Sequence, residues 1–249
     1  MGLAISLILT SCAKSKVDKN NDLGSGDKST LPVTLVSLIE HAEYCKAIYD
    51  GGGSEKDNVA FEVKQKDGIS IIVIRGTANE ANVLSDIDVR LVNDVRLGIR
   101  LHKGFRDAAT TIMQIIDTSM TTRGVVQGQS RTYPLEHTVH VTGHSLGGAV
   151  AQIIGMWLHK RGKNVQVYSF GSPKVSDQVL SGGQPTHWRI SNPVDPIPFT
   201  PPWPYRHTGL FIDPRDGDWG PDWDNGLISK TDGLDHAIAK YLEKLKALR

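Results

Sequence analysis

The fold is decided by the stretch Gly143-His144-Ser145-Leu146-Gly147-Gly148, which follows a β-rich run from Thr138 to Thr142 and precedes a helical pattern from Ala149 to Lys160. A serine on a sharp strand-to-helix turn adopts a strained backbone conformation. Glycines two residues to either side are needed, because a Cβ there would collide with the neighbouring strand and helix. The turn lifts the serine Oγ clear of the sheet. It also directs the Leu146 N–H and the helix N-terminus toward one point, where an oxyanion would be stabilised.

Strands alternate with helices on both sides of this stretch. The run from Ile69 to Ile74 is nearly all apolar and β-branched, which is typical of a central strand covered on both faces. Asp67-Gly68 before it favours a tight turn. Such alternation predicts an α/β fold with a mainly parallel sheet and helices on both faces, whose ligands lie at the carboxyl ends of the strands. We expect helices at 35–49, 105–120, 149–160 and 237–248, and strands at 59–63, 69–74, 87–91, 138–142, 165–170 and 187–190.

Composition narrows the class of protein. The 249 residues, 39% of them hydrophobic, suffice for one domain with a sizeable core. The 28 Lys and Arg against 27 Asp and Glu give a net charge of +1, which excludes the basic field of a nucleic-acid-binding protein. The two cysteines, Cys12 and Cys45, are too few for a disulfide framework or a structural zinc site. We expect no metal and no cofactor, and the oligomeric state is not predicted.

The N-terminus resembles a bacterial lipoprotein signal. Residues 1–11 contain a short apolar run that ends in Leu9-Thr10-Ser11-Cys12, the pattern in which the cysteine becomes lipid-modified after cleavage. A buried or disordered N-terminal strand is the alternative. Residues 12–30 are too polar to fold and are interpreted as a disordered tether, followed by the α/β domain at 31–249. We therefore expect lipidation at Cys12 and a membrane-anchored protein of the bacterial cell envelope, or a secreted one.

The G-x-S-x-G pattern is the nucleophile elbow of α/β-hydrolases, in which a serine, an acid and a histidine follow one another along the chain. We predict Ser145 as nucleophile and His236, at the start of the last helix, as base. His207 and His187 are the alternatives. Asp195 lies in a proline-rich loop after a strand, where a triad carboxylate is needed to orient the histidine, and Asp177 is the alternative acid.

Together these residues resemble the class 3 lipase family of α/β-hydrolases, which includes fungal triacylglycerol lipases and feruloyl esterases. The resemblance implies that Thr77 and Leu146 donate hydrogen bonds to the oxyanion, whereas a strand-end threonine that caps a turn is the alternative for Thr77. The matching blocks are Arg75-Gly76-Thr77, His102-Lys103-Gly104-Phe105, Gly143 to Gly148, Phe170-Gly171-Ser172-Pro173-Lys174-Val175, Asp195-Pro196-Ile197-Pro198 and Asp235-His236 with Tyr241 behind them.

The sequence departs from the family at the lid. A strand at 87–91 leaves only 78–86, little more than two helical turns, for a segment that would cover the site. We therefore expect a weakly covered serine. The loop from Phe199 to Tyr205, with Trp203 among prolines, is either a packed loop, a rim of the acyl site or an interfacial anchor.

The expected function is hydrolysis of carboxylic esters through an acyl-enzyme, on acylglycerols or on short-to-medium acyl esters. A phospholipase A1 or a feruloyl-type esterase is the alternative among enzymes. A surface lipoprotein that uses the fold for binding only is the alternative outside them. The expected partners are a lipid or small ester and a membrane surface.

Overall fold

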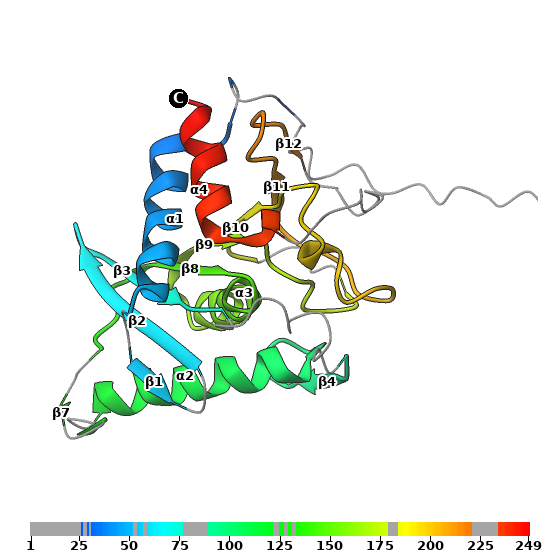
Figure 1. Cartoon of the computed structure of the whole chain (residues 1–249). Coiled ribbons are helices and arrows are strands. Elements are labelled where there is room, and N and C mark those ends of the chain that lie inside the picture. The colour runs from blue at the N-terminus through cyan, green and yellow to red at the C-terminus, as the bar shows by residue number, and fades with distance from the viewer. Residues whose placement is uncertain are drawn as a thin grey trace, which may run out of the picture.

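The computed structural model describes residues 26, 29, 31–51, 54–56, 59–76, 89–121, 125–126, 129–130, 133–178, 184–220 and 234–249. Its centre is an eight-stranded sheet with the order β1-β2-β3-β8-β9-β10-β11-β12 (Figure 1). The strands of this sheet are β1 (Ser54–Lys56), β2 (Val59–Lys66), β3 (Ile69–Ile74), β8 (Thr138–His144), β9 (Asn164–Phe170), β10 (Thr186–Ile190), β11 (Leu210–Ile212) and β12 (Trp219–Gly220).

The strands from β3 to β11 in this order pair in parallel, and the antiparallel pairs lie at the two edges. The turn Asp67-Gly68 joins β2 to β3, and both residues have positive φ, 51° and 74°. An Asp-Gly pair accepts such angles, which suit a tight hairpin. The predicted α/β-hydrolase architecture, a mainly parallel sheet in a single domain, is confirmed.

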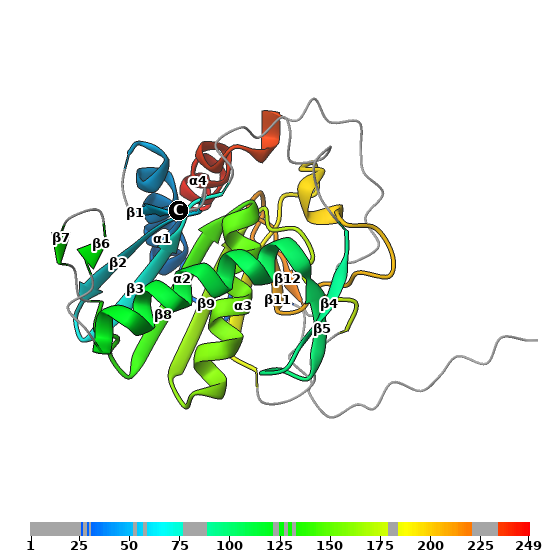
Figure 2. The same ribbon diagram turned by 90° about the horizontal axis from the view of Figure 1, so that it is seen from below.

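Helices cover both faces of the sheet (Figures 1 and 2). On one face, α2 (Lys103–Thr121) and α3 (Leu146–Lys160) pack on the strand residues Ile72, Val139 and Val167. On the other face, α1 (Leu35–Tyr49) and α4 (Ile238–Ala247) pack together over β9 and β10. The helices from the two ends of the chain therefore share one face.

The expected strand at 87–91 was placed wrongly. Its residues 87–88 lie outside the described part of the chain, and Val89 is 55% exposed and precedes the strand that forms. That strand, β4 (Leu91–Asp94), pairs with β5 (Ile99–His102) in an antiparallel hairpin of its own. The Asp94 side chain explains the shift, because it accepts hydrogen bonds from the turn N–H groups of Arg96 and Leu97 and from Trp157. A second small hairpin joins β6 (Val125–Val126) and β7 (Gln129–Ser130).

The proposed tether is not free of structure along its whole length. Gly26 forms an antiparallel bridge with Trp219 at the β12 edge, with N···O distances of 3.1 and 2.9 Å. An edge strand offers N–H and C=O groups to a neighbouring segment, which explains this pairing. The tether at 12–30 stays a prediction, because apart from Gly26 and Ser29 its residues lie outside the described part of the chain. Cys12 and its signal lie outside the described residues. In the described part of the chain, no helix is long and apolar enough to cross a membrane.

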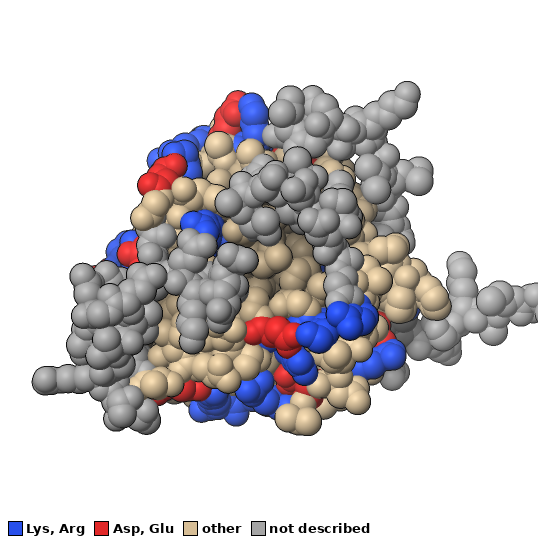
Figure 3. All heavy atoms as spheres, turned by 60° about the horizontal axis from the view of Figure 1, so that its bottom comes forward, with Lys and Arg blue, Asp and Glu red and all other residues tan. Residues whose placement is uncertain are grey.

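Charges are mixed over the surface. Lys and Arg lie next to Asp and Glu on the face shown in Figure 3, and ion pairs such as Lys103–Asp107 and Arg161–Asp117 join them. No group of three or more His, Cys, Asp or Glu within the described ranges is arranged to hold a metal ion.

A neutral histidine pair lies between α1 and the sheet. His41 Nδ1–H donates to the Ser37 carbonyl at 2.7 Å, so His41 Nε2 accepts from His140 Nδ1 at 3.2 Å. The His41 ring stacks on Tyr168 with 3.6 Å between ring centroids. Burial disfavours the imidazolium and lowers the pKa of His41 to about 4. The titratable groups that face this ring are Glu40, Tyr44, Lys66, His140 and Tyr168.

We expect stability to fall as the pH drops from about 6.5 toward about 4, the range between the ordinary and the lowered pKa of His41. The unfolded chain binds a proton in this range that the folded chain excludes, which costs on the order of 3 kcal/mol in full. His41→Phe keeps the stack on Tyr168 and should remove the His41 share of this dependence. The buried His144, His187 and His207, whose pKa values are also lowered, keep their shares. Urea titrations at pH 7 and pH 5 measure it, with His137→Gln, an exposed histidine, as control. Equal pH dependence in parent and His41→Phe would contradict the assignment.

Candidate active site

Ser145 lies on the turn between β8 and α3. Its φ of 58° and ψ of −132° are strained for a residue with a Cβ, and its N–H bonds to the Phe170 carbonyl of β9 at 2.9 Å. Two glycines make the turn possible. A Cβ on Gly143 would lie 2.2 Å from the Gly147 carbonyl oxygen, and one on Gly147 would lie 2.3 Å from the Ile74 carbonyl oxygen. The spacing of the elbow therefore follows from backbone packing.

The structure brings Ser145, His236 and Asp195 together. Ser145 Oγ lies 2.8 Å from His236 Nε2, and His236 Nδ1 lies 2.7 Å from Asp195 Oδ2. The carboxylate can only accept, so Nδ1 carries the proton and Nε2 is free to accept the serine proton. His236 belongs to a 3-10 helix, Leu234–His236, just before α4, and Asp195 follows β10.

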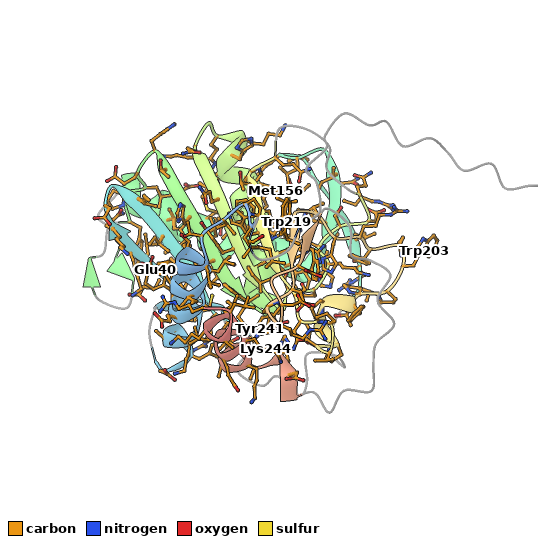
Figure 4. All side chains as sticks on the ribbon, turned by 90° about the horizontal axis from the view of Figure 1, so that it is seen from above. Glu40, Met156, Trp203, Trp219, Tyr241 and Lys244 are labelled. Atoms are coloured by element: carbon orange, nitrogen blue, oxygen red, sulfur yellow. The ribbon has the colours of Figure 1, made fainter. Side chains whose placement is uncertain are left out.

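Both oxygens of the Asp195 carboxylate accept hydrogen bonds. Its Oδ1 accepts from the Ile197 N–H at 2.9 Å, and its Oδ2 accepts from the Tyr241 hydroxyl at 2.6 Å in addition to His236. The Tyr241 oxygen in turn accepts from the Asn192 N–H at 3.1 Å. Burial, with the adjacent carboxylate adding to it, raises the pKa of Tyr241 well above its usual range. Tyr241 and Lys244 both come from α4 (Figure 4), and Lys244 pairs with Asp235. The last helix therefore holds both the acid and the segment that bears His236.

Gly171, just after β9, makes room for this arrangement. It has a φ of 56°, and a Cβ there would lie 2.8 Å from Asp195 Oδ2 and 3.2 Å from His236 Cε1. Any side chain at this position would push the acid and the histidine apart.

The histidine inside the elbow supports the backbone of His236. His144 Nε2 lies 2.7 Å from the His236 carbonyl and must donate to it, so His144 Nδ1 accepts from the Tyr49 hydroxyl at 2.9 Å. His144 is fully buried, and this burial, together with the neighbouring His236, holds its pKa well below the usual range. It therefore stays neutral. The sequence had suggested no role for Tyr49, His144, Gly171 or Asn192, although His144 lies beside the serine and Gly171 lies in a block that matches the family.

The alternative residues have other partners. His207 Nε2 binds the Pro198 carbonyl at 2.6 Å, and His187 Nε2 lies 2.8 Å from Ser169 Oγ. Asp177 forms an ion pair with Arg100. None of these contacts involves Ser145.

The remaining site predictions differ in outcome. Thr77 and the lid interval 78–86 lie outside the described residues. Leu146 is the first residue of α3, so its N–H is not used by the hydrogen bonds of the helix itself. Ser145 and Asp195 are 0% exposed and His236 is 2% exposed, but the lid interval is not described, so the weak covering of the serine stays a prediction. The described groups next to the serine include His236, whose Nε2 lies 2.8 Å from Oγ, and the strand end at Gly76.

Solved structures with the same fold are fungal lipases. The triacylglyceride lipase of Rhizomucor miehei matches with a TM-score of 0.65 and 23% identity over 86% of this chain and 96% of that one. The lipase of Rhizopus microsporus var. chinensis matches with a TM-score of 0.63 and 19% identity over 88% and 96%. These likenesses show that the chain shares the fold of these lipases.

The family model for lipase (class 3) matches residues 71–205, more than half of the 249 residues, and the chain belongs to this family. The secreted mono- and diacylglycerol lipase 1 of Fusarium solani is 28% identical over 231 residues, 79% of this chain and 67% of that protein. The lipase of Rhizomucor miehei is 32% identical over 142 residues, 53% of this chain and 37% of its own length. The protein is a carboxylic ester hydrolase of the class 3 lipase family.

We expect His144→Phe to lower kcat for ester hydrolysis by about tenfold or more with little change in KM, because the His236 backbone loses a donor. His144→Gln should stay within a few-fold of the parent, since a glutamine amide can donate to the carbonyl and accept from Tyr49. Steady-state kinetics on p-nitrophenyl butyrate measure both, and melting temperatures control for folding. Equal losses in the two variants would mean that the ring fills space only.

Proposed function

We propose that Ser145 is the nucleophile, His236 the general base and Asp195 the residue that orients the histidine. The observation that carries this proposal is the continuous hydrogen-bond chain from Ser145 Oγ through the His236 ring to Asp195 Oδ2, at 2.8 and 2.7 Å. A serine hydroxyl is a poor nucleophile until a base takes its proton, and this chain supplies the base in the required tautomer.

In this mechanism Ser145 Oγ attacks the ester carbonyl while its proton passes to His236 Nε2. The Leu146 N–H and Thr77 hold the oxyanion that forms. The imidazolium, stabilised by Asp195, gives its proton to the departing alcohol, and the serine ester remains. Water, deprotonated by His236, then releases the acid and restores the serine. The proposed mechanism needs no cofactor.

For the substrate we propose acylglycerols, or short-to-medium acyl esters. The Fusarium solani relative, named for mono- and diacylglycerols, supports this class. A phospholipase A1 or a feruloyl-type esterase is the alternative. Parallel assays on emulsified tributyrin, phosphatidylcholine and methyl ferulate distinguish the three, and we expect tributyrin to be hydrolysed fastest.

We expect Ser145→Ala to abolish ester turnover and His236→Ala to lower it about 10³-fold or more, as loss of a triad base does. His207→Ala should retain most of the activity, because His207 contacts a backbone carbonyl. Rates on p-nitrophenyl butyrate test the ranking. If His207→Ala proves the more damaging variant, the base is assigned wrongly.

A role in binding alone is the alternative outside enzymes. A fluorophosphonate probe distinguishes the two, because it reacts only with an activated serine. Labelling of the parent and its loss in Ser145→Ala support catalysis, whereas an unlabelled parent supports the binding role.

We also propose that Cys12 is lipidated and anchors the domain to a membrane surface, on the strength of Leu9-Thr10-Ser11-Cys12. The Fusarium solani relative is named as secreted, which agrees with export but not with an anchor.

Metabolic labelling with a palmitate analogue in a bacterial host should mark the parent and not Cys12→Ser. The signal should also move the parent, and not the variant, into the membrane fraction. An unlabelled parent in a host that lipidates a known lipoprotein would refute the anchor.

A further inference from the structure

The loop between Asp195 and Arg206 presents an exposed tryptophan. Trp203 is 85% exposed, and no other described aromatic residue is among the exposed large hydrophobic side chains. Figure 4 shows its side chain pointing away from the body of the molecule. The ten residues from Pro196 to Tyr205 include no Asp, Glu, Lys, Arg or His. An aromatic side chain that costs free energy in water is thus held at the tip of an uncharged segment.

Hydrogen bonds fix both flanks of this loop. The Thr200 carbonyl accepts from the Lys174 N–H at 2.8 Å, and the Pro198 carbonyl binds His207 at 2.6 Å. On the far side, the buried Tyr205 donates its hydroxyl to the Val89 carbonyl at 2.7 Å. Because the flanks are held, Trp203 does not need to be ordered when it meets a partner, which lowers the entropic cost of binding.

The loop lies at the edge of the sheet that bears the triad. It begins immediately after Asp195, whose Oδ1 accepts from the Ile197 N–H of the loop. Tyr205 links it to Val89, a second exposed apolar side chain at 55% exposure. The loop that carries Trp203 is therefore joined directly to the site at Asp195.

The chemistry of the loop selects the partner. A tryptophan carries a large apolar ring with one N–H donor, and it favours the boundary between water and acyl chains. The absence of charge over ten residues fits a neutral lipid surface and gives no basis for recognising an ionic ligand. The first cationic residue after the loop is Arg206, which lies outside the uncharged segment.

We propose that the loop 196–205 is a docking surface for a neutral lipid–water interface, with Trp203 as its anchor. This proposal rests on the proposed function, since it names the surface from which the ester would be taken. Docking brings the interface to the loop that is joined to the site at Asp195.

The test is partition onto lipid by protein that carries both Cys12→Ser, so that no lipid anchor contributes, and Ser145→Ala, so that the lipid stays intact. Sedimentation with phosphatidylcholine vesicles, with vesicles that also contain phosphatidylglycerol and with triolein emulsion measures it. Trp203→Ser on that background should lower partition about tenfold, the loss expected when roughly half of a large aromatic side chain no longer enters the interface. Trp203→Phe should keep most of it. Val36→Ala, an exposed apolar residue of α1 at 62% exposure, is the matched control and should partition like the parent.

Equal partition of the Trp203→Ser and Val36→Ala proteins overturns the proposal. So does partition that requires phosphatidylglycerol and ignores Trp203, because surface cations would then carry it. Hydrolysis of tributyrin by the otherwise unaltered protein reports separately on the proposed function. If the parent hydrolyses no ester but partition depends on Trp203, the chemistry is wrong and the docking surface stands.

Discussion

The site depends on one steric constraint, the close approach of three backbone segments at the end of β8. Gly143 and Gly147 leave no room for a Cβ between β8, α3 and β3, so the chain reverses within the few residues of the elbow. The reversal imposes a positive φ on Ser145, and the bond from its N–H to the Phe170 carbonyl ties the strained residue to β9. Strain at this residue is tolerated because the central parallel strands surround it, and it places Oγ at their carboxyl edge.

The two helices that share one face connect this edge to both ends of the chain. Tyr49, the last residue of α1, reaches His144 inside the elbow, and Tyr241 of α4 reaches Asp195. In each contact a single hydroxyl donates, to Asp195 of the proposed triad in one case and to His144, which binds the His236 carbonyl, in the other. Packing of α1 against α4 therefore determines how His236 lies relative to Ser145, although neither helix carries the nucleophile.

Local sequence patterns predicted most of the helices and strands of this fold. They predicted fewer of the segments that connect them. The run from Ile69 to Ile74 and the Asp67-Gly68 turn follow from side-chain type alone, and they lie where expected. The alternation of Ile87, Val89 and Leu91 predicted a strand in the wrong place, because the strand that forms, β4, extends to the buried polar residue Asp94. The Asp94 side chain accepts a hydrogen bond from Trp157, which lies far along the chain and could not be linked to it by a local pattern. The order of serine, acid and histidine indicated which residues meet. Tyr49 could not be found this way, because a tyrosine at helical spacing looks like any core residue until its distant partner is known.

Electrostatics explains why a second histidine can lie beside the proposed base. The ring centroids of His144 and His236 are 4.7 Å apart, and one carboxylate, Asp195, faces the pair through His236 Nδ1. Two imidazolium ions at this separation in a buried site would repel strongly, since the low dielectric screens them little. Burial keeps His144 neutral, and its remaining proton is committed to the His236 carbonyl. In the proposed mechanism, the positive charge that develops on His236 as it takes the serine proton therefore meets Asp195 without a competing cation. Ser145 and Asp195 are 0% exposed, and burial of this kind strengthens the pairing of a developing charge with a carboxylate.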